Sequence, residues 1–179
     1  MTSAPFPRDK IAAGLAFLLG LAAIGLAWGS QLFGGLVPCE LCLEQRNAYY
    51  LGLPILGAIL LFWNRLPLAV WYAGMAVVAA IFVWSTYMGA FHAGVEWGFW
   101  PGPTACTGTG TSISFNDLSD INANRVVPCD AVQFRFAGLS LAGLNALVSL
   151  AVVALLALSA FWQARGRARR PSGAARHSF

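Results

Sequence analysis

The chain has 179 residues, of which 58% are hydrophobic and 10% are charged, with a net charge of +4 and a mean hydropathy of +0.66. Soluble domains carry about 25% charged residues, and disordered chains are richer still in polar and charged residues, so both classes are excluded. Four cysteines are also too few for a small disulfide-stapled fold of this length. The composition therefore predicts an integral membrane protein.

Long apolar runs predict the membrane-spanning helices. A spanning helix needs about 20 predominantly apolar residues, and the runs of that kind cover about residues 11–29, 46–63, 69–91 and 138–162. The second run is the shortest, and Arg46 at its start can keep its stem in the apolar zone and its guanidinium in water. The first run is longer than the apolar core of a signal peptide, so we expect it to remain as a span.

These spans predict an all-α membrane protein, a four-transmembrane-helix bundle with two exoplasmic loops. The expected outer loops cover residues 30–45 and 92–137, and a basic cytoplasmic tail covers 163–179. The whole chain, 1–179, is expected to form a single integral membrane domain. In the second loop we interpret Glu96 as a solvated charge.

The distribution of basic residues predicts the orientation. If both termini lie in the cytoplasm, the inner segments hold Arg8, Lys10, Arg65, Arg165, Arg167, Arg169, Arg170 and Arg176. The outer side holds only Arg46, Arg125 and Arg135. This bias follows the positive-inside rule. We interpret the arginine-rich tail as an anchor beside anionic lipid headgroups, and we expect no nucleic-acid partner.

All four cysteines fall on the expected outer side. Cys39 and Cys42 form a Pro-Cys-x-x-Cys motif before the second span, and Cys106 and Cys129 lie in the second loop. Free cysteine is common in apolar cores, yet the expected spans contain none. Cysteines in even number on one face indicate disulfide chemistry in an oxidising compartment.

Three interpretations of these cysteines compete. Structural disulfides suit Cys106 and Cys129, but a Cys-x-x-Cys ring is so small that it constrains little chain entropy. Zinc ribbons pair one Cys-x-x-Cys with another; the second pair here is widely spaced and no histidine accompanies it, so we expect no metal. Thiol–disulfide exchange between two cysteine pairs is the third interpretation, and the surroundings of Cys39 and Cys42 favour it.

The start of the second span is suited to a reactive thiol. The free N–H groups and positive dipole end of a helix are expected near Cys42, and Arg46 follows one helical turn later. Both features favour a thiolate, which is the nucleophile in disulfide exchange. The pair also lies at the membrane surface, within reach of a lipid-soluble oxidant.

These features together resemble the DsbB family of bacterial inner-membrane disulfide-forming oxidoreductases. The resemblance rests on the four spans, the Pro-Cys-x-x-Cys before the second span, Arg46 four positions later, and the distant cysteine pair. The strings Gly-Pro-Thr-Ala-Cys-Thr around Cys106, Pro-Cys-Asp around Cys129 and Phe-Ala-Gly-Leu-Ser-Leu before the fourth span are also similar. The resemblance covers about residues 11–162.

The resemblance implies a mechanism, a cofactor and a partner. A periplasmic thioredoxin-fold oxidase of the DsbA type would attack a Cys106–Cys129 disulfide at Cys106, and electrons would pass to the Cys39–Cys42 pair. Cys42, beside Arg46, would face a bound quinone, either ubiquinone or menaquinone, and His92 is a further candidate contact. The implied activity is that of a quinone-dependent protein-disulfide oxidoreductase in electron transport. The implied location is the bacterial inner membrane, with the cysteines facing the periplasm.

Other functions remain as alternatives. The vitamin K epoxide reductase-like family shares the chemistry, but there the Cys-x-x-Cys lies late in the chain. A non-redox, cysteine-stapled scaffold or a small transporter belongs to a different class. Transporters usually carry ionisable residues inside their spans, and the expected spans here have none beyond Arg46 at one edge.

Overall fold

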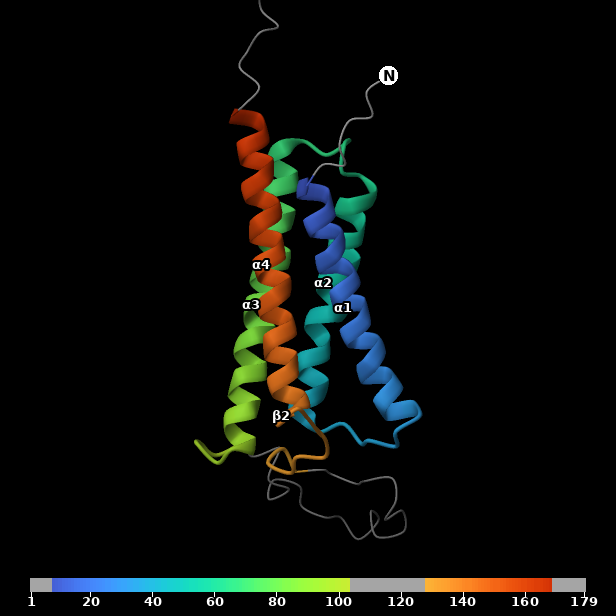
Figure 1. The fold of residues 1–179 in the computed structure, drawn as a ribbon, viewed down its shortest axis with the longest axis vertical. Helices are drawn as coiled ribbons and strands as arrows, with labels where there is room; N and C mark the ends of the chain where they lie inside the picture. Colours follow the sequence, from blue (N-terminus) through green and yellow to red (C-terminus); the bar gives the residue numbers. More distant parts are fainter. Residues whose placement is uncertain (1–7, 104–127, 169–179) are drawn as a thin grey trace, which may run out of the picture.

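The computed structural model describes residues 8–103 and 128–168, and its framework is four long helices. The elements are α1 (Arg8–Leu32), α2 (Glu40–Leu61), α3 (Leu68–Glu96), β1 (Arg135–Phe136), β2 (Leu139–Ser140) and α4 (Leu141–Ala168). The helices run alternately up and down, so that α1 begins and α4 ends at the same end of the bundle (Figure 1). The expected helical bundle is thus confirmed for the described residues.

Three of the four helices are long and apolar enough to cross a membrane: α1, α3 and α4 as far as Gly166. The fourth, α2, has 22 residues, but its first two turns carry the charged residues Glu40, Glu44 and Arg46. It packs between its neighbours, with contacts to both α1 and α3. The number of helices that span the membrane therefore stays a prediction for α2.

All four helices differ from the expected spans at their ends, and two of these differences place functional residues on helices. The second helix begins at Glu40 because Cys39 caps it. The third continues to Glu96, where Gly98 N–H bonds to Val95 O and Phe99 N–H bonds to Gly94 O. These are the two hydrogen bonds of a glycine-terminated helix end, and Gly98 has the positive φ of +74° that this ending requires.

An apolar core fills the end of the bundle at which α1 begins. It buries Leu56, Trp71, Val78, Phe82, Val152 and Leu156 among other side chains from α2, α3 and α4. The first helix contributes small residues, Ala13 and Ala16, that let it approach closely. Close packing of small and large side chains is the main source of helix association in lipid.

The other end of the bundle requires a very close approach of α3 to α4. A Cβ atom added at Gly89 would lie 2.8 Å from the backbone nitrogen of Ala146. A side chain at position 89 would therefore push the two helices apart. This contact brings the last turns of α3 against the first turns of α4.

Hydrogen bonds at two places fix the segment that leads into α4. The strands pair antiparallel through a tight turn at Ala137 and Gly138, both with positive φ, and the buried Ser140 Oγ accepts the Gly143 N–H at 3.2 Å. Further back, the Gln133 side chain accepts the Val37 N–H at 3.2 Å and donates to the Val37 carbonyl at 2.6 Å. This pair of bonds ties the segment after Cys129 to the segment before Cys39.

Candidate active site

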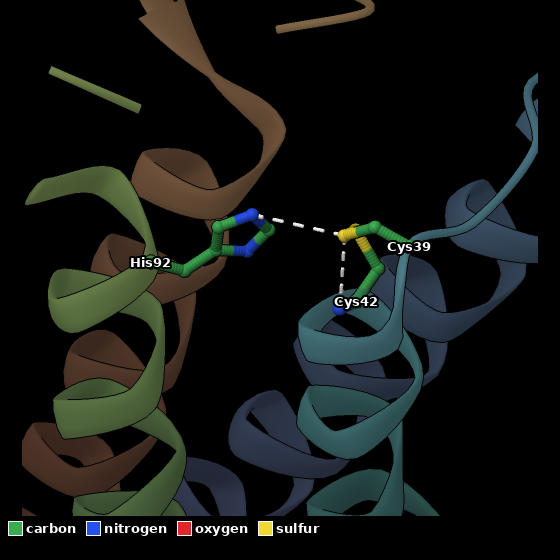
Figure 2. Close-up of side chains that lie close together, drawn as sticks. All are labelled: Cys39, Cys42 and His92. Carbon is green, nitrogen blue, oxygen red and sulfur yellow. Dashed lines mark hydrogen bonds between the residues drawn. A yellow bond between two sulfur atoms is a disulfide. The ribbon is translucent and has the colours of Figure 1, made fainter. Parts of the chain in front are cut away.

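Cys39 and Cys42 form a disulfide at the N-terminus of α2 (Figure 2). Cys39 is the N-cap residue, and its Sγ accepts the backbone N–H of Cys42 at 3.3 Å. The sequence placed the helix N-terminus near Cys42, but the N–H donor points at the sulfur of Cys39. The dipole end of α2 therefore favours negative charge on Cys39. The Cys39 residue is 5% exposed, whereas Cys42 is partly exposed.

His92 projects from α3 toward this disulfide, as Figure 2 shows. Its Nε2 lies 3.7 Å from Cys39 Sγ and 3.2 Å from the carbonyl oxygen of Cys129, and its Nδ1 lies 2.8 Å from Gln45 Nε2. The residue is only 2% exposed. The expected contact of His92 with a quinone stays a prediction, whereas its contact with the cysteine pair is a feature that the sequence did not indicate.

Glu96 follows His92 by one helical turn, and the interpretation of Glu96 as a solvated loop charge is wrong. Its side chain is 7% exposed, with Oε1 at 3.9 Å from His92 Nε2. Its Oε2 is buried without a hydrogen-bond partner among the described residues. The physical reason is the extension of α3, which carries position 96 inward on the same face as position 92.

The second cysteine pair is described only in part. Cys129 is 2% exposed and packs with Cys39 and Leu41 in a small buried cluster. It is disulfide-bonded. Cys106, the predicted point of attack, lies outside the described residues. Packing of Cys129 against Cys39 nevertheless brings members of the two sequence-distant pairs together.

A cavity of about 340 Å³ lies beside the disulfide. Its walls come from all four helices and from the segments around Val37 and Gln133. They include Cys39, Cys42 and Arg46, and from α3 His92 and Glu96. Ligand pockets span roughly 300–1,000 Å³ and combine apolar walls with a few polar groups. The cavity has this character, since apolar side chains such as Ile24 and Val148 line it together with Gln45, Arg46 and Asn145.

Arg46 is held at the wall of this cavity by α1. Its guanidinium donates to Gln31 Oε1 at 2.8 Å and to the Ala27 carbonyl at 3.2 Å, and it lies 5.8 Å from the Trp28 ring centroid. Within residues 8–103 and 128–168, Arg46 makes no ion pair. Its positive charge is therefore oriented by neutral groups and stays available to the cavity.

Neutral polar side chains behind His92 are the part of the site that the sequence analysis missed. They are Gln45 and Tyr49 on α2, Ser85 on α3, and Asn145 and Ser149 on α4. A signal was present in the sequence, because Gln45 and Tyr49, and likewise Asn145 and Ser149, are spaced four apart and share a helix face. Attention to ionisable groups alone left that pattern unused.

Cys39, Cys42 and His92 are residue types that bind metal ions, but with the disulfide formed they cannot act as a set of metal ligands. The ligand atoms of Cys39, Cys42 and His92 all lie within 4.8 Å of one another. Zinc is bound by thiolates, and here the two sulfurs are bonded to each other. The arrangement is that of a disulfide beside a buried histidine.

Comparison with known proteins places the chain among disulfide-forming membrane proteins. The family model described as "Disulfide bond formation protein DsbB" matches residues 9–159. The matched region contains Cys39, Cys42, Arg46 and His92, and it spans both cysteine pairs. No curated protein and no solved structure gives a significant match.

Proposed function

The chain belongs to the DsbB family, and we propose from this membership that it reoxidises a periplasmic thioredoxin-fold oxidase of the DsbA type and passes the electrons to a membrane quinone. The observation that carries the proposal is the Cys39–Cys42 disulfide, which lies between a buried Cys129 and an apolar cavity. This position supports electron entry from the side of Cys129 and electron exit on the side of the cavity.

Electron entry is proposed to occur through Cys106 and Cys129. A thiolate of the reduced partner attacks the Cys106–Cys129 disulfide at Cys106, forming a mixed disulfide and releasing the Cys129 thiolate. The partner's second thiol then completes the partner's disulfide and frees Cys106. Burial of Cys129 against Cys39 supports the next exchange, in which the Cys129 sulfur bonds to Cys39 and releases Cys42 as thiolate. The freed Cys106 then attacks Cys129, which restores the Cys106–Cys129 disulfide, releases Cys39 and leaves Cys39 and Cys42 as the reduced pair that the quinone reoxidises.

The cavity beside Cys42 fits a quinone headgroup by its chemistry. A quinone supplies the terminal acceptor, since it becomes quinol by taking up two electrons and two protons. The apolar walls suit the ring, and the Arg46 guanidinium, fixed by Gln31 and the Ala27 carbonyl, is available to a carbonyl oxygen. Arg46 and His92 are the residues proposed to hold the headgroup, while Cys42 faces it.

The proposed topology has four spans with both termini in the cytoplasm of a bacterium and the protein in the inner membrane. Arg8 and Lys10 at the start of α1, Arg65 between α2 and α3, and Arg165 near the end of α4 belong to one end of the bundle (Figure 1). The disulfide belongs to the opposite end. The positive-inside rule then puts the cysteines on the periplasmic face.

The decisive experiment is quinone reduction by the purified protein. The full chain in detergent is supplied with a reduced thioredoxin-fold oxidase and with ubiquinone or menaquinone, and quinol formation is followed by absorbance. We expect that either ubiquinone or menaquinone supports oxidation of the partner thiols, with one quinol formed per partner disulfide. The Cys42→Ser variant should show no turnover. Absence of turnover with both quinones would overturn the proposal.

Thiol trapping in cells tests the redox cycle against a structural role for the cysteines. When quinone is depleted, the proposal predicts that free thiols accumulate at Cys39, Cys42, Cys106 and Cys129. A stapled scaffold would keep all four oxidised. The Cys129→Ala variant should also retain the partner on Cys106 as a mixed disulfide on non-reducing gels, and its absence would show that entry occurs elsewhere.

A further inference from the structure

The surroundings of His92 determine which of its ring nitrogens carries the proton. The Nε2 atom faces the Cys129 carbonyl oxygen at 3.2 Å and the disulfide sulfur of Cys39 at 3.7 Å, and Glu96 Oε1 lies at 3.9 Å. A carbonyl oxygen and a disulfide sulfur can only accept hydrogen bonds. The Nε2 atom is therefore the donor, and in the neutral ring Nδ1 is the acceptor.

A chain of neutral side chains matches this assignment on the other side of the ring. Because Nδ1 accepts, Gln45 donates to it through Nε2 at 2.8 Å. The Gln45 Oε1 then accepts from Asn145 Nδ2 at 2.7 Å, and Asn145 Oδ1 accepts from the Tyr49 hydroxyl at 2.6 Å. Each amide is thereby fixed in one orientation by the next group.

The chain of bonds is anchored on three helices. Gln45 and Tyr49 lie on α2, His92 on α3 and Asn145 on α4. Beyond Tyr49 the bonds continue to Ser149 at 3.3 Å and from there to Ser85 at 2.9 Å. Satisfied buried networks of this kind rigidify the groups that they contain.

We propose that Gln45, Asn145 and Tyr49 form a neutral relay that positions His92 as its Nε2–H tautomer, so that this N–H is presented to the sulfur of Cys39. The three are positioning residues, because they act through His92. The inference rests on the proposed function, since it describes how the proposed redox pair is supported. It assigns these amides and the tyrosine a role that the disulfide and the cavity alone do not require.

On the Nδ1 side, His92 faces the amide of Gln45 and not a carboxylate, whereas the Glu96 carboxylate lies on the Nε2 side at 3.9 Å. A carboxylate behind a histidine accepts from the ring and stabilises the doubly protonated imidazolium. An amide N–H donated to Nδ1 does the reverse, because a second ring proton at Nδ1 would face that donor directly. Gln45 therefore favours a neutral ring that donates from Nε2 and does not act as a base toward Cys39.

The consequence appears when the disulfide is reduced. A negative charge on Cys39 Sγ would face the Cys42 N–H, which lies at 3.3 Å from this sulfur. The Nε2–H of His92 becomes a second, charge-assisted donor to the same sulfur. Loss of the relay should weaken that donor and lower the fraction of Cys39 present as thiolate.

The first test reads the tautomer directly. Nitrogen-15 NMR of the full chain in detergent, labelled at histidine, distinguishes protonated from bare ring nitrogens. The chain has only two histidines, so His177→Gln assigns the spectrum. We expect His92 to show a protonated Nε2 and a bare, hydrogen-bonded Nδ1. A proton on Nδ1, in either the other tautomer or an imidazolium, would overturn the proposal.

The second test removes the relay without touching the histidine. In Gln45→Leu, and to a smaller extent in Asn145→Leu, the His92 nitrogen signals should shift toward those of an unrestrained imidazole. Alkylation of Cys39 in the reduced protein, resolved by mass spectrometry, should slow by up to about tenfold in Gln45→Leu, the effect expected when His92 Nε2–H no longer donates to the charged sulfur. Unchanged signals and rates would refute the relay.

The matched control is Thr86→Val. It removes the partly buried hydrogen bond that the Thr86 hydroxyl, next to Ser85 in the chain but outside the relay, donates to the Phe82 carbonyl. It should leave both readouts as in the unmodified protein. An equal change in Thr86→Val would mean that general loosening of the bundle, and not the relay, moves them. Neither readout uses a quinone or a partner, so failure of the proposed function would leave this test intact.

Discussion

The two ends of the bundle are built from the same four helices and are packed in opposite ways. At the end where α1 begins, Trp71 is 2% exposed and meets Trp63 edge to face at 5.1 Å between ring centroids. At the disulfide end the helices enclose a cavity of about 340 Å³ and bury His92 and Gln45 beside it. One end is filled by closely packed apolar side chains. The other has a cavity and buried polar side chains in their place.

This difference indicates that one end of the bundle provides stability and the other end provides the reactive site. Tight apolar packing holds the helices together, so it can carry the stability of the whole bundle. The polar end can then contain a cavity and the Cys39–Cys42 disulfide while the helices stay packed together. Four predictions test this division by changing one end at a time.

The largest effect is expected for Cys42→Ser at the disulfide end. Serine cannot form the disulfide, so quinone reduction should fall by at least about a thousandfold. Stability in detergent should barely change, because the Cys-x-x-Cys ring constrains little chain entropy. Turnover and thermal unfolding measured on one preparation check both halves, and a large loss of stability would contradict the division.

At the opposite end, Trp71→Ala should give the reverse pattern. Removal of a buried tryptophan destabilises a protein by about 3–5 kcal/mol, while turnover per folded molecule should be unchanged. The matched control is Trp84→Ala, since Trp84 is 62% exposed and has little packing to lose. Denaturant unfolding in mixed micelles measures the two variants, and equal losses would show that the apolar end is not the source of stability.

Arg46→Ala should affect binding more than structure. The guanidinium is held at the cavity wall by Gln31 and the Ala27 carbonyl, so its loss should raise the KM for quinone by about tenfold, the effect of one charge-assisted hydrogen bond. Arg46→Lys should be intermediate, because an ammonium lacks the planar fork that reaches two acceptors at once. An unchanged KM would reduce Arg46 to an interfacial anchor.

The smallest effect compares two glycines of α3. Gly89→Ala places Cβ 2.8 Å from the Ala146 backbone, whereas Gly74→Ala places it 2.9 Å from the mobile end of the Ile59 side chain. Backbone cannot move aside as a side chain can, so Gly89→Ala should cost about 1–3 kcal/mol of stability. Gly74→Ala should be close to neutral. The same unfolding assay decides, and equal costs would contradict the close helix contact at the disulfide end.

Much of the fold could be predicted from the sequence because the bilayer imposes it. Apolar runs of about 20 residues mark spanning helices whatever their neighbours are, and the order and approximate place of all four helices follow. The termini of the helices did not follow, because they depend on local bonds. The capping sulfur of Cys39 and the glycine-terminated end at Gly98 moved two boundaries by several residues.

The site could be predicted from the sequence where it consists of residue types with reactive side chains. Cys39 and Cys42 are such residues, and their disulfide is found. Gln45 and Asn145 are not, since a neutral amide has no chemistry of its own. Their role depends on their hydrogen-bond partners on other helices. The distances to those partners depend on tertiary packing, which a local sequence pattern does not predict.

The two hydrogen bonds between Gln133 and Val37 have a kinetic consequence. They tie the chain just after Cys129 to the chain just before Cys39, at 3.2 and 2.6 Å. A tether of a few residues on each side sets an effective concentration of one sulfur at the other in the millimolar range or above. In the proposed transfer between the two pairs, soluble thiols at lower concentration would therefore compete poorly with the tethered sulfur.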